Sequence, residues 1–93
     1  MWTVEIARSA EKEIKKAPQT IRNSFDAWKN LIEHYGPQSV QKINGYSDHA
    51  LKGEWKGSRS SSLSEQWRVI YVVKGGAVKI LVLKITPHDY RRK

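Results

Sequence analysis

The sequence contains no cysteine, which excludes disulfide bonds and metal sites built from thiolates. No apolar run approaches the roughly 20 residues that a membrane-spanning helix requires, so we expect no contact with a membrane. The first residues, Met-Trp-Thr-Val-Glu-Ile, lack the basic segment and the long apolar run of a secretory signal peptide. Together these absences favour a cytoplasmic protein.

Several catalytic patterns are missing as well. No glycine-rich phosphate loop follows an expected strand, and no group of His, Asp or Glu residues has the spacing of a metal site. The run Ser60-Ser61-Ser62 lacks the context of a nucleophile elbow, so it is interpreted as a polar strand face. We therefore expect neither a metal nor another cofactor.

The length of 93 residues predicts a single domain over residues 1–93, with little room for a second core. A hydrophobic fraction of 39% and four tryptophans are enough for a packed interior. The net charge of +8 is unevenly distributed. Residues 1–48 contain seven basic and six acidic side chains, a balance of +1, and residues 49–93 contain ten and three, a balance of +7. The second half is expected to bind a polyanion, with a basic surface that merely aids solubility as the alternative.

Hydrophobic periodicity predicts one strand and two helices in the first half of the chain. Residues 2–6 alternate as in a strand, and Ser9 is expected to cap a short helix over residues 10–16. Pro18 starts a second helix, which ends at Gly36-Pro37. The apolar stripe of this helix is expected to face the core and consists of Ile21, Phe25, Trp28, Ile32 and Tyr35.

The second half is predicted to contain a helical turn and three antiparallel strands. Residues 38–43 form the turn, and the strands cover residues 58–63, 67–74 and 77–85, with Gly75-Gly76 as a two-residue hairpin loop of the type that tolerates positive φ. The last strand is apolar on both faces, which predicts a central place in the sheet. The expected fold is α+β: an N-terminal strand, an antiparallel two-helix hairpin and three antiparallel strands, with the helices packed on one face of a small sheet.

The tail after the last strand carries side chains suited to the cleavage of RNA. RNA supplies its own nucleophile, the 2′-OH, so a protein needs only a base, an acid and cations that stabilise the phosphate. His88 and Tyr90 point the same way if the extended backbone continues past Pro87, and an imidazole can act as acid or base near neutral pH. The alternatives are a solvated histidine and a packing tyrosine.

Two further groups of cations are candidates for binding phosphate. Arg68 begins a strand face that is otherwise apolar, so its guanidinium must either pair with Glu65 or Glu54 or bind an anion. In residues 49–59, three cations interleave with two glycines and Trp55. We expect Trp55 to pack in the core rather than to stack on a base. The three cations either belong to an ordinary surface or follow a phosphate backbone; they are Lys52, Lys56 and Arg59.

The segment Leu51-Lys52-Gly53-Glu54-Trp55-Lys56-Gly57, followed by Gln66-Trp67-Arg68-Val69-Ile70-Tyr71 and a final strand with a His/Tyr tail, resembles the RelE/ParE toxin superfamily. It is most similar to the RelE, HigB, YoeB and YafQ toxins, the mRNA interferases of type II toxin–antitoxin systems. Asp48-His49-x-Leu51 is especially similar to YafQ.

The resemblance implies a RelE-like fold and a ribosome-dependent endoribonuclease that cleaves translated mRNA. The implied cleavage is metal-independent attack of the 2′-OH on the adjacent phosphate. The implied partners are mRNA on the 70S ribosome, with contacts to 16S rRNA, and a cognate antitoxin protein that inhibits the enzyme.

The resemblance also implies roles for individual residues. Arg68 matches an arginine that stabilises phosphate charge, His88 matches a residue near the leaving group, Tyr90 matches an orienting tyrosine, and His49 matches a general base. The residues implied to bind RNA are Lys52, Lys56, Arg59 and Arg91. The chain departs from its relatives at Ser61 and Ser62, where many carry a cation, and at Asp89, between His88 and Tyr90.

Two other functions remain open from the sequence. A ParE-like toxin acting on DNA gyrase would need no acid–base tail. A non-catalytic RNA-binding module would be expected to expose more aromatic side chains than Trp55 alone.

Overall fold

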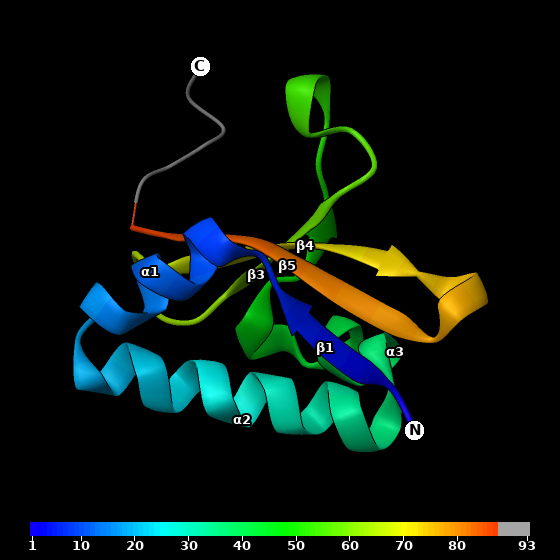
Figure 1. Cartoon of the computed structure of the whole chain (residues 1–93), viewed down its shortest axis with the longest axis horizontal. Coiled ribbons are helices and arrows are strands. Elements are labelled where there is room, and N and C mark those ends of the chain that lie inside the picture. The colour runs from blue at the N-terminus through cyan, green and yellow to red at the C-terminus, as the bar shows by residue number, and fades with distance from the viewer. Residues whose placement is uncertain (88–93) are drawn as a thin grey trace.

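A five-stranded sheet in the order β1-β5-β4-β3-β2 organises the computed structural model, which describes residues 1–87 (Figure 1). β1 pairs parallel to β5, and all other neighbours are antiparallel. β5 lies between β1 and β4, so it is an interior strand, as the sequence predicts. The strands are β1 (Thr3–Ile6), β2 (His49–Ala50), β3 (Arg59–Ser62), β4 (Arg68–Lys74) and β5 (Lys79–Thr86).

The helices α1 (Arg8–Lys16), α2 (Gln19–Tyr35) and α3 (Pro37–Lys42) follow β1. Figure 1 shows α2 as the longest helix, running along one side of the sheet. Gly36 ends α2 with a φ of 85°, and a Cβ atom there would lie 3.0 Å from the indole nitrogen of Trp2. A glycine is therefore required both by the backbone and by the space. Three short 3₁₀ turns lie in the connections: η1 (Asn44–Tyr46), η2 (Gly53–Trp55) and η3 (Gly75–Ala77).

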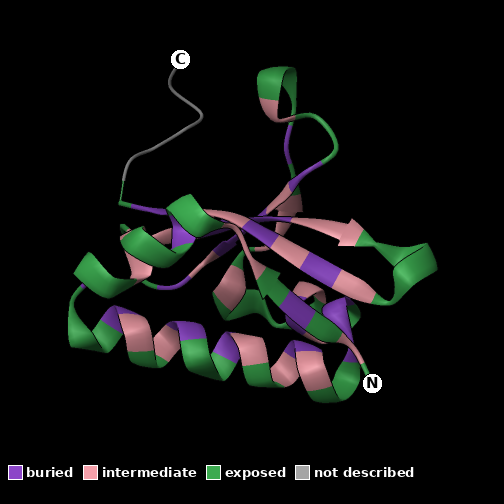
Figure 2. Cartoon of the chain, in the orientation of Figure 1, coloured by how far each residue is buried: buried purple, intermediate pink, exposed green. Residues whose placement is uncertain are grey.

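The hydrophobic core lies between α2 and the sheet. The stripe of α2 that faces the sheet is buried (Figure 2), and Trp28 at its centre has no exposed surface. Trp28 stacks on Phe25 at 5.6 Å between ring centroids and meets Tyr71 of β4 edge-on at 5.2 Å. Replacing a fully buried aromatic of this kind by alanine costs about 3–5 kcal/mol. The α+β architecture predicted from the sequence is confirmed.

Two expectations about the helices are wrong. Ser9 does not cap α1: the helix begins at Arg8, the N-cap position is Ala7, and no side chain caps it. Tyr35 is 74% exposed, because it is the last residue of α2 and lines an open cavity on the outer surface with Leu31 and His34.

The connection between β4 and β5 also differs from the prediction. It contains η3 and Val78, so it is longer than a two-residue hairpin loop. Neither Gly75 nor Gly76 has a positive φ, whereas Val78 does, at 52°. Because a 3₁₀ turn uses right-handed backbone angles, the reversal of φ falls on the residue that follows the turn.

Candidate active site

The face of the sheet away from the core carries the candidate site. In the β3–β4 register Ser61 is opposite Val69, which belongs to the core, so the neighbouring pair Ser60 and Ile70 faces the other way. His49 of β2 lies directly opposite Ser60 and shares its face. Alternation along β3 and β4 adds Ser62 and Arg68 to this face, which is called the site face below.

Arg68 is held on the site face by a neutral partner. Its Nη1 donates to the hydroxyl of Ser62 at 2.8 Å. Within residues 1–87 the partner of the guanidinium is thus a hydroxyl and not the carboxylate of Glu65 or Glu54. A hydroxyl carries no formal charge, so the cation keeps its ability to bind an anion such as phosphate.

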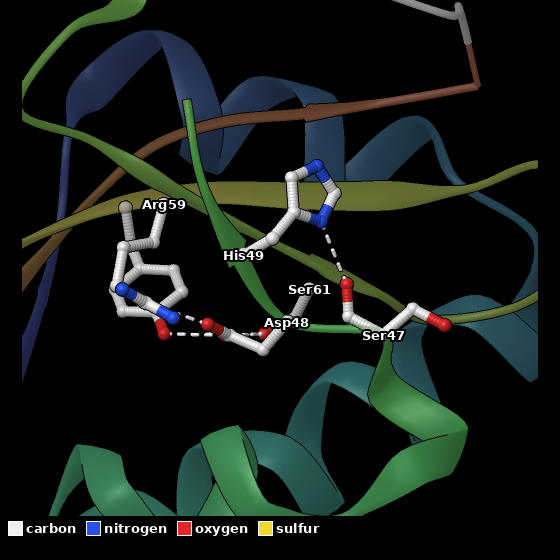
Figure 3. A network of polar contacts seen from close by, with 6 residues as sticks. Ser47, Asp48, His49, Arg59 and Ser61 are labelled. Atoms are coloured by element: carbon white, nitrogen blue, oxygen red, sulfur yellow. Dashed lines mark hydrogen bonds and ion pairs between the residues drawn. The ribbon is translucent and has the colours of Figure 1, made fainter. Parts of the chain in front are cut away.

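His49 is half-buried and has a defined ring orientation. Its Nδ1 lies 2.8 Å from the backbone carbonyl of Ser47 (Figure 3). A carbonyl can only accept, so Nδ1 must be the donor, and in the neutral ring Nε2 then carries the lone pair. This tautomer is the one in which Nε2 can accept a proton.

Ser60, between His49 and Ile70 in the register, is completely buried. Within the part of the chain that the structure describes, its hydroxyl oxygen has no hydrogen-bond partner. The sequence interpretation treated the three serines as one polar strand face. The structure instead gives each a separate environment: Ser60 is buried beside His49, Ser61 faces the core side and Ser62 holds Arg68.

Figure 3 shows Asp48 on the opposite side of the chain from His49. Its side chain is fully buried. It accepts hydrogen bonds from Nε of Arg59 at 2.7 Å, from the hydroxyl of Tyr71 at 2.5 Å and from the hydroxyl of Ser61. These four residues, Asp48, Arg59, Ser61 and Tyr71, are called the Asp48 network below. It ties β2 to β3 and β4.

The environment of the network shifts two pKa values. Burial, together with the hydrogen bond to Asp48, raises the pKa of Tyr71 well above its usual value of 10.0. Burial alone would lower the pKa of Arg59, but the hydrogen bond and the charge of Asp48 outweigh it and raise that pKa. Tyr71 therefore stays a neutral donor and Arg59 stays a charged one, so that both keep their hydrogen bonds to Asp48.

A loop beside the site face carries the lysines expected to bind RNA. Figure 1 shows this loop, with η2 at its tip, projecting from the sheet on the side away from α2. Lys52 and Lys56 flank η2 and are exposed. Gly53 and Gly57 adopt positive φ angles of 67° and 97°, which turn the loop tightly.

Trp55 and Arg59 differ from the other residues of this segment. Trp55 is half-buried and is not among the side chains of residues 1–87 that pack into the core, so the expectation of a core tryptophan is wrong. Arg59, expected to face RNA, is paired with Asp48 on the opposite side of the strand.

Three sequence candidates, His88, Tyr90 and Arg91, lie outside the described residues. In the described part, β5 ends at Thr86, which pairs with Arg68 of β4. β4 lies between β5 and β3. No group of three His, Cys, Asp or Glu side chains in residues 1–87 has the geometry to hold a metal ion. No helix in that range is long and apolar enough to cross a lipid bilayer.

Sequence reasoning assigned no role to Asp48 or to Tyr71. One signal did exist, because a tyrosine on an otherwise apolar strand face requires a partner for its hydroxyl. The partner itself is 23 positions away, and periodicity within one strand says nothing about it.

Comparisons with known proteins point to one fold. The sequence matches no protein-family model and no curated protein. Solved structures do match. RelE, in the RelE–RelB complex from Pyrococcus horikoshii OT3, has a TM-score of 0.75 and 24% identity, over 96% of this chain and 97% of that chain. This chain has the RelE-like toxin fold.

Two other toxins of this fold match over similar lengths. YafQ from E. coli strain BL21(DE3) has a TM-score of 0.75 and 20% identity over 91% of both chains. YoeB in the YoeB–YefM toxin–antitoxin complex from Staphylococcus aureus has a TM-score of 0.73 and 14% identity, over 96% of this chain and 99% of that chain. The RelE-like fold that the sequence motifs imply is therefore confirmed.

Proposed function

We propose that this protein is a ribosome-dependent mRNA endoribonuclease, the toxin of a toxin–antitoxin pair. The observation that carries the proposal is the site face, where a histidine in the tautomer of a base and an arginine with a neutral partner lie on two strands that flank β3 in a RelE-like fold. β2 and β4 are two strand spacings apart, so the backbones of His49 and Arg68 are separated by about 10 Å across the sheet and about 7 Å along it. That distance leaves room for one nucleotide between the two side chains.

Each residue then has a chemical role. Nε2 of His49 takes the proton of the 2′-OH, and Arg68 stabilises the negative charge that builds on the phosphate. His88 protonates the leaving 5′-oxygen, and Tyr90 orients or stacks on the substrate. Both belong to the tail beyond the described residues, so these roles rest on the sequence resemblance. No metal is required, since the substrate supplies the nucleophile.

The lysines bind RNA in this proposal rather than react with it. Lys52 and Lys56 lie on the exposed loop beside the site face, and Arg91 belongs to the basic tail beyond the described residues. Arg59 was expected among them, but its ion pair with Asp48 gives it a structural part in holding β2. The mRNA is bound on the 70S ribosome, with contacts to 16S rRNA.

A cognate antitoxin is the second proposed partner. Several solved neighbours of this fold are toxin–antitoxin complexes, among them DinJ–YafQ from E. coli with a TM-score of 0.72. The exposed positive charge of the second half of the chain favours an acidic inhibitory segment. Cytoplasmic action follows from the ribosomal substrate.

Induced expression of the chain followed by primer extension on translated messages tests this function. We expect growth arrest, with cuts inside the coding region at codons in the ribosomal A site. The double variant His49→Ala/Arg68→Ala is the matched control and should leave messages intact. Purified protein with programmed ribosomes should cut in the presence of EDTA and should leave a 2′,3′-cyclic or 3′-phosphate.

The competing functions give different results in the same experiment. Intact messages together with a loss of DNA supercoiling would indicate a gyrase toxin. Binding to RNA without any cut would indicate a non-catalytic module. Cleavage of a substrate whose scissile nucleotide lacks the 2′-OH would exclude the proposed mechanism.

A further inference from the structure

The strand that carries His49, β2, is too short for its backbone pairing alone to fix the position of this residue. β2 contains two residues, paired with Ser60 and Arg59 of β3. A two-residue pairing at the edge of a sheet contributes little stability of its own. Something other than the backbone ladder must therefore hold the orientation of the imidazole.

The Asp48 network supplies that anchor. Asp48 directly precedes His49, and because side chains alternate along an extended chain, the two point in opposite directions (Figure 3). Its carboxylate is 0% exposed and reaches donors on two strands, β3 and β4. One of the donors, Tyr71, is itself fixed in the core by its contact with Trp28. The position of the backbone at residue 48 is thus tied to the core.

The residue before Asp48 completes the arrangement. Ser47 has a φ of 44° and a ψ of 42°, the left-handed conformation that a non-glycine residue seldom adopts. In this conformation its carbonyl oxygen lies 2.8 Å from Nδ1 of His49. Such backbone strain persists only where the surroundings hold it in place, and the adjacent residue, Asp48, is the one tied to the core.

We propose that Asp48 is a positioning residue, whose buried carboxylate holds the turn from Ser47 to His49 so that the Ser47 carbonyl keeps the imidazole proton on Nδ1 and the lone pair on Nε2. The inference deepens the proposed ribonuclease function, and it rests on that function only for the role of His49 as the base.

In the reaction, the proton of the 2′-OH passes to Nε2 while the 2′-oxygen forms a bond to phosphorus. The bond from phosphorus to the 5′-oxygen breaks, and the leaving oxygen takes a proton from the acid. The products are a 2′,3′-cyclic phosphate and a 5′-hydroxyl. With the opposite tautomer, Nε2 would carry a proton and could not accept the one from the 2′-OH.

The variant Asp48→Asn tests the anchor. Asparagine has nearly the same shape, but its single oxygen cannot accept from three donors, and its amide would face at least one of them. Glu13→Gln is the matched control, because Glu13 is a half-buried carboxylate that likewise ties elements together: it accepts from Lys84 at 2.9 Å and from the backbone N–H of Ile85 at 2.9 Å. Thermal unfolding of both variants establishes that each is folded.

The first readout is the tautomer of His49, measured by ¹⁵N NMR of ring-labelled full-length protein under alkaline conditions. We expect the Nδ1–H form in the parent and in Glu13→Gln, and a mixture of both tautomers in Asp48→Asn. An unchanged Nδ1–H form in folded Asp48→Asn would overturn the proposal. This readout needs no substrate, so it remains valid even if the parent proves not to cleave RNA.

The second readout is a double-mutant cycle on single-turnover cleavage by programmed ribosomes. Asp48→Asn should lower the rate of cutting at least tenfold with little change in ribosome affinity, and it should have little further effect in a His49→Ala background. Equal losses in both backgrounds would mean that Asp48 does not act through His49, and would overturn the proposal. A parent that does not cut would contradict the proposed function instead.

A milder variant covers the case in which Asp48→Asn does not fold. Tyr71→Phe removes one of the three donors and keeps the aromatic ring against Trp28. It should shift the tautomer and the rate in the same direction by a smaller amount. A folded Tyr71→Phe protein with the parent's tautomer and rate, alongside an unfolded Asp48→Asn protein, would limit the network to stability and overturn the positioning role.

Discussion

At the residue scale, Arg68 illustrates how a single partner decides what a cation can do. An arginine on an apolar strand face is commonly neutralised by a carboxylate, which would take two of its N–H donors in a bidentate contact. Here Nη1 donates to the hydroxyl of Ser62, and within residues 1–87 no carboxylate pairs with the guanidinium. Arg59, nine residues earlier, shows the opposite outcome, since its charge is neutralised by an ion pair with the carboxylate of Asp48.

The first prediction concerns Arg68. Arg68→Ala should lower the single-turnover rate of RNA cleavage by about 10²–10³-fold, the usual loss when a preorganised donor to a developing charge is removed. Affinity for ribosomes should change little. Lys74→Ala, at the exposed far end of the same strand, is the control and should retain the parent's rate. A weaker affinity with an unchanged rate would show that Arg68 binds the substrate without acting on the reaction.

A second prediction at this scale concerns the response to alkali. Because burial and the hydrogen bond to Asp48 raise the pKa of Tyr71, the folded protein favours the neutral phenol. A group whose pKa is raised by folding contributes stability that is complete below its unfolded pKa and declines as the pH rises above it. The decline should begin near pH 10.0, the ordinary pKa of tyrosine.

Urea unfolding of the parent and of Tyr71→Phe at about pH 8 and about pH 11 measures this effect. The phenylalanine variant should be less stable than the parent at the lower pH, and the difference should shrink at the higher pH. A difference that is the same at both values would show that Tyr71 is not titrated on unfolding.

At the scale of elements, the β4–β5 connection places a branched residue where the backbone is strained. Val78 has a φ of 52°, which crowds a β-branched side chain, and it is 43% exposed, so it buries little in return. Thr3 donates its backbone N–H to the carbonyl of Val78, a contact that any residue at this position can accept. The strain is therefore local to the side chain.

Val78→Asn should raise the free energy of unfolding by about 1 kcal/mol, because asparagine tolerates the left-handed conformation. The melting temperature of a domain of this size should increase by about 4–8 °C. Gly76→Ala is the control: a Cβ at Gly76 meets nothing within 4 Å and its φ is not positive, so this change should be neutral or slightly stabilising. A large loss in Gly76→Ala would favour the glycine hairpin loop predicted from the sequence.

At the scale of the whole molecule, the distribution of charge bears on the proposed binding of RNA. Among residues 1–87, several cations of the second half are neutralised by ion pairs: Arg59 by Asp48, Lys79 by Glu5 and Lys84 by Glu13. Lys52 and Lys56 take no part in such pairs and lie on the projecting loop. Within residues 1–87, these two lysines are therefore exposed cations without an ion pair on the loop beside the site face.

Lys52→Ala and Lys56→Ala should each weaken binding to ribosomes and reduce the salt dependence of binding by about one phosphate contact. The rate of cutting on saturated ribosomes should stay near that of the parent. Lys29→Ala is the control, since Lys29 lies on α2 and pairs with Glu33 at 3.5 Å. Equal changes in the salt slope for all three variants would mean that the loop has no special contact with RNA.

The sequence by itself determined the kinds of element and the side each presents to the core. The stripe of α2 from Ile21 to Ile32 and the doubly apolar β5 are predictable because burial follows a periodicity of 3.6 or 2 within one segment. The motifs around Arg68 and His49 likewise predicted the RelE-like fold, which the solved neighbours confirm.

Only the tertiary structure decided which side chains meet. The pairs Asp48–Tyr71 and Arg68–Ser62 depend on strand register, and a shift of one residue would turn each side chain to the other face. The same holds for Arg59. Its place in the sequence predicts a cation that binds RNA, but the strand register brings its guanidinium to Asp48. The left-handed residues Ser47 and Val78 are not glycines, so the sequence did not mark these positions; each directly follows a 3₁₀ turn, and the backbone reverses there.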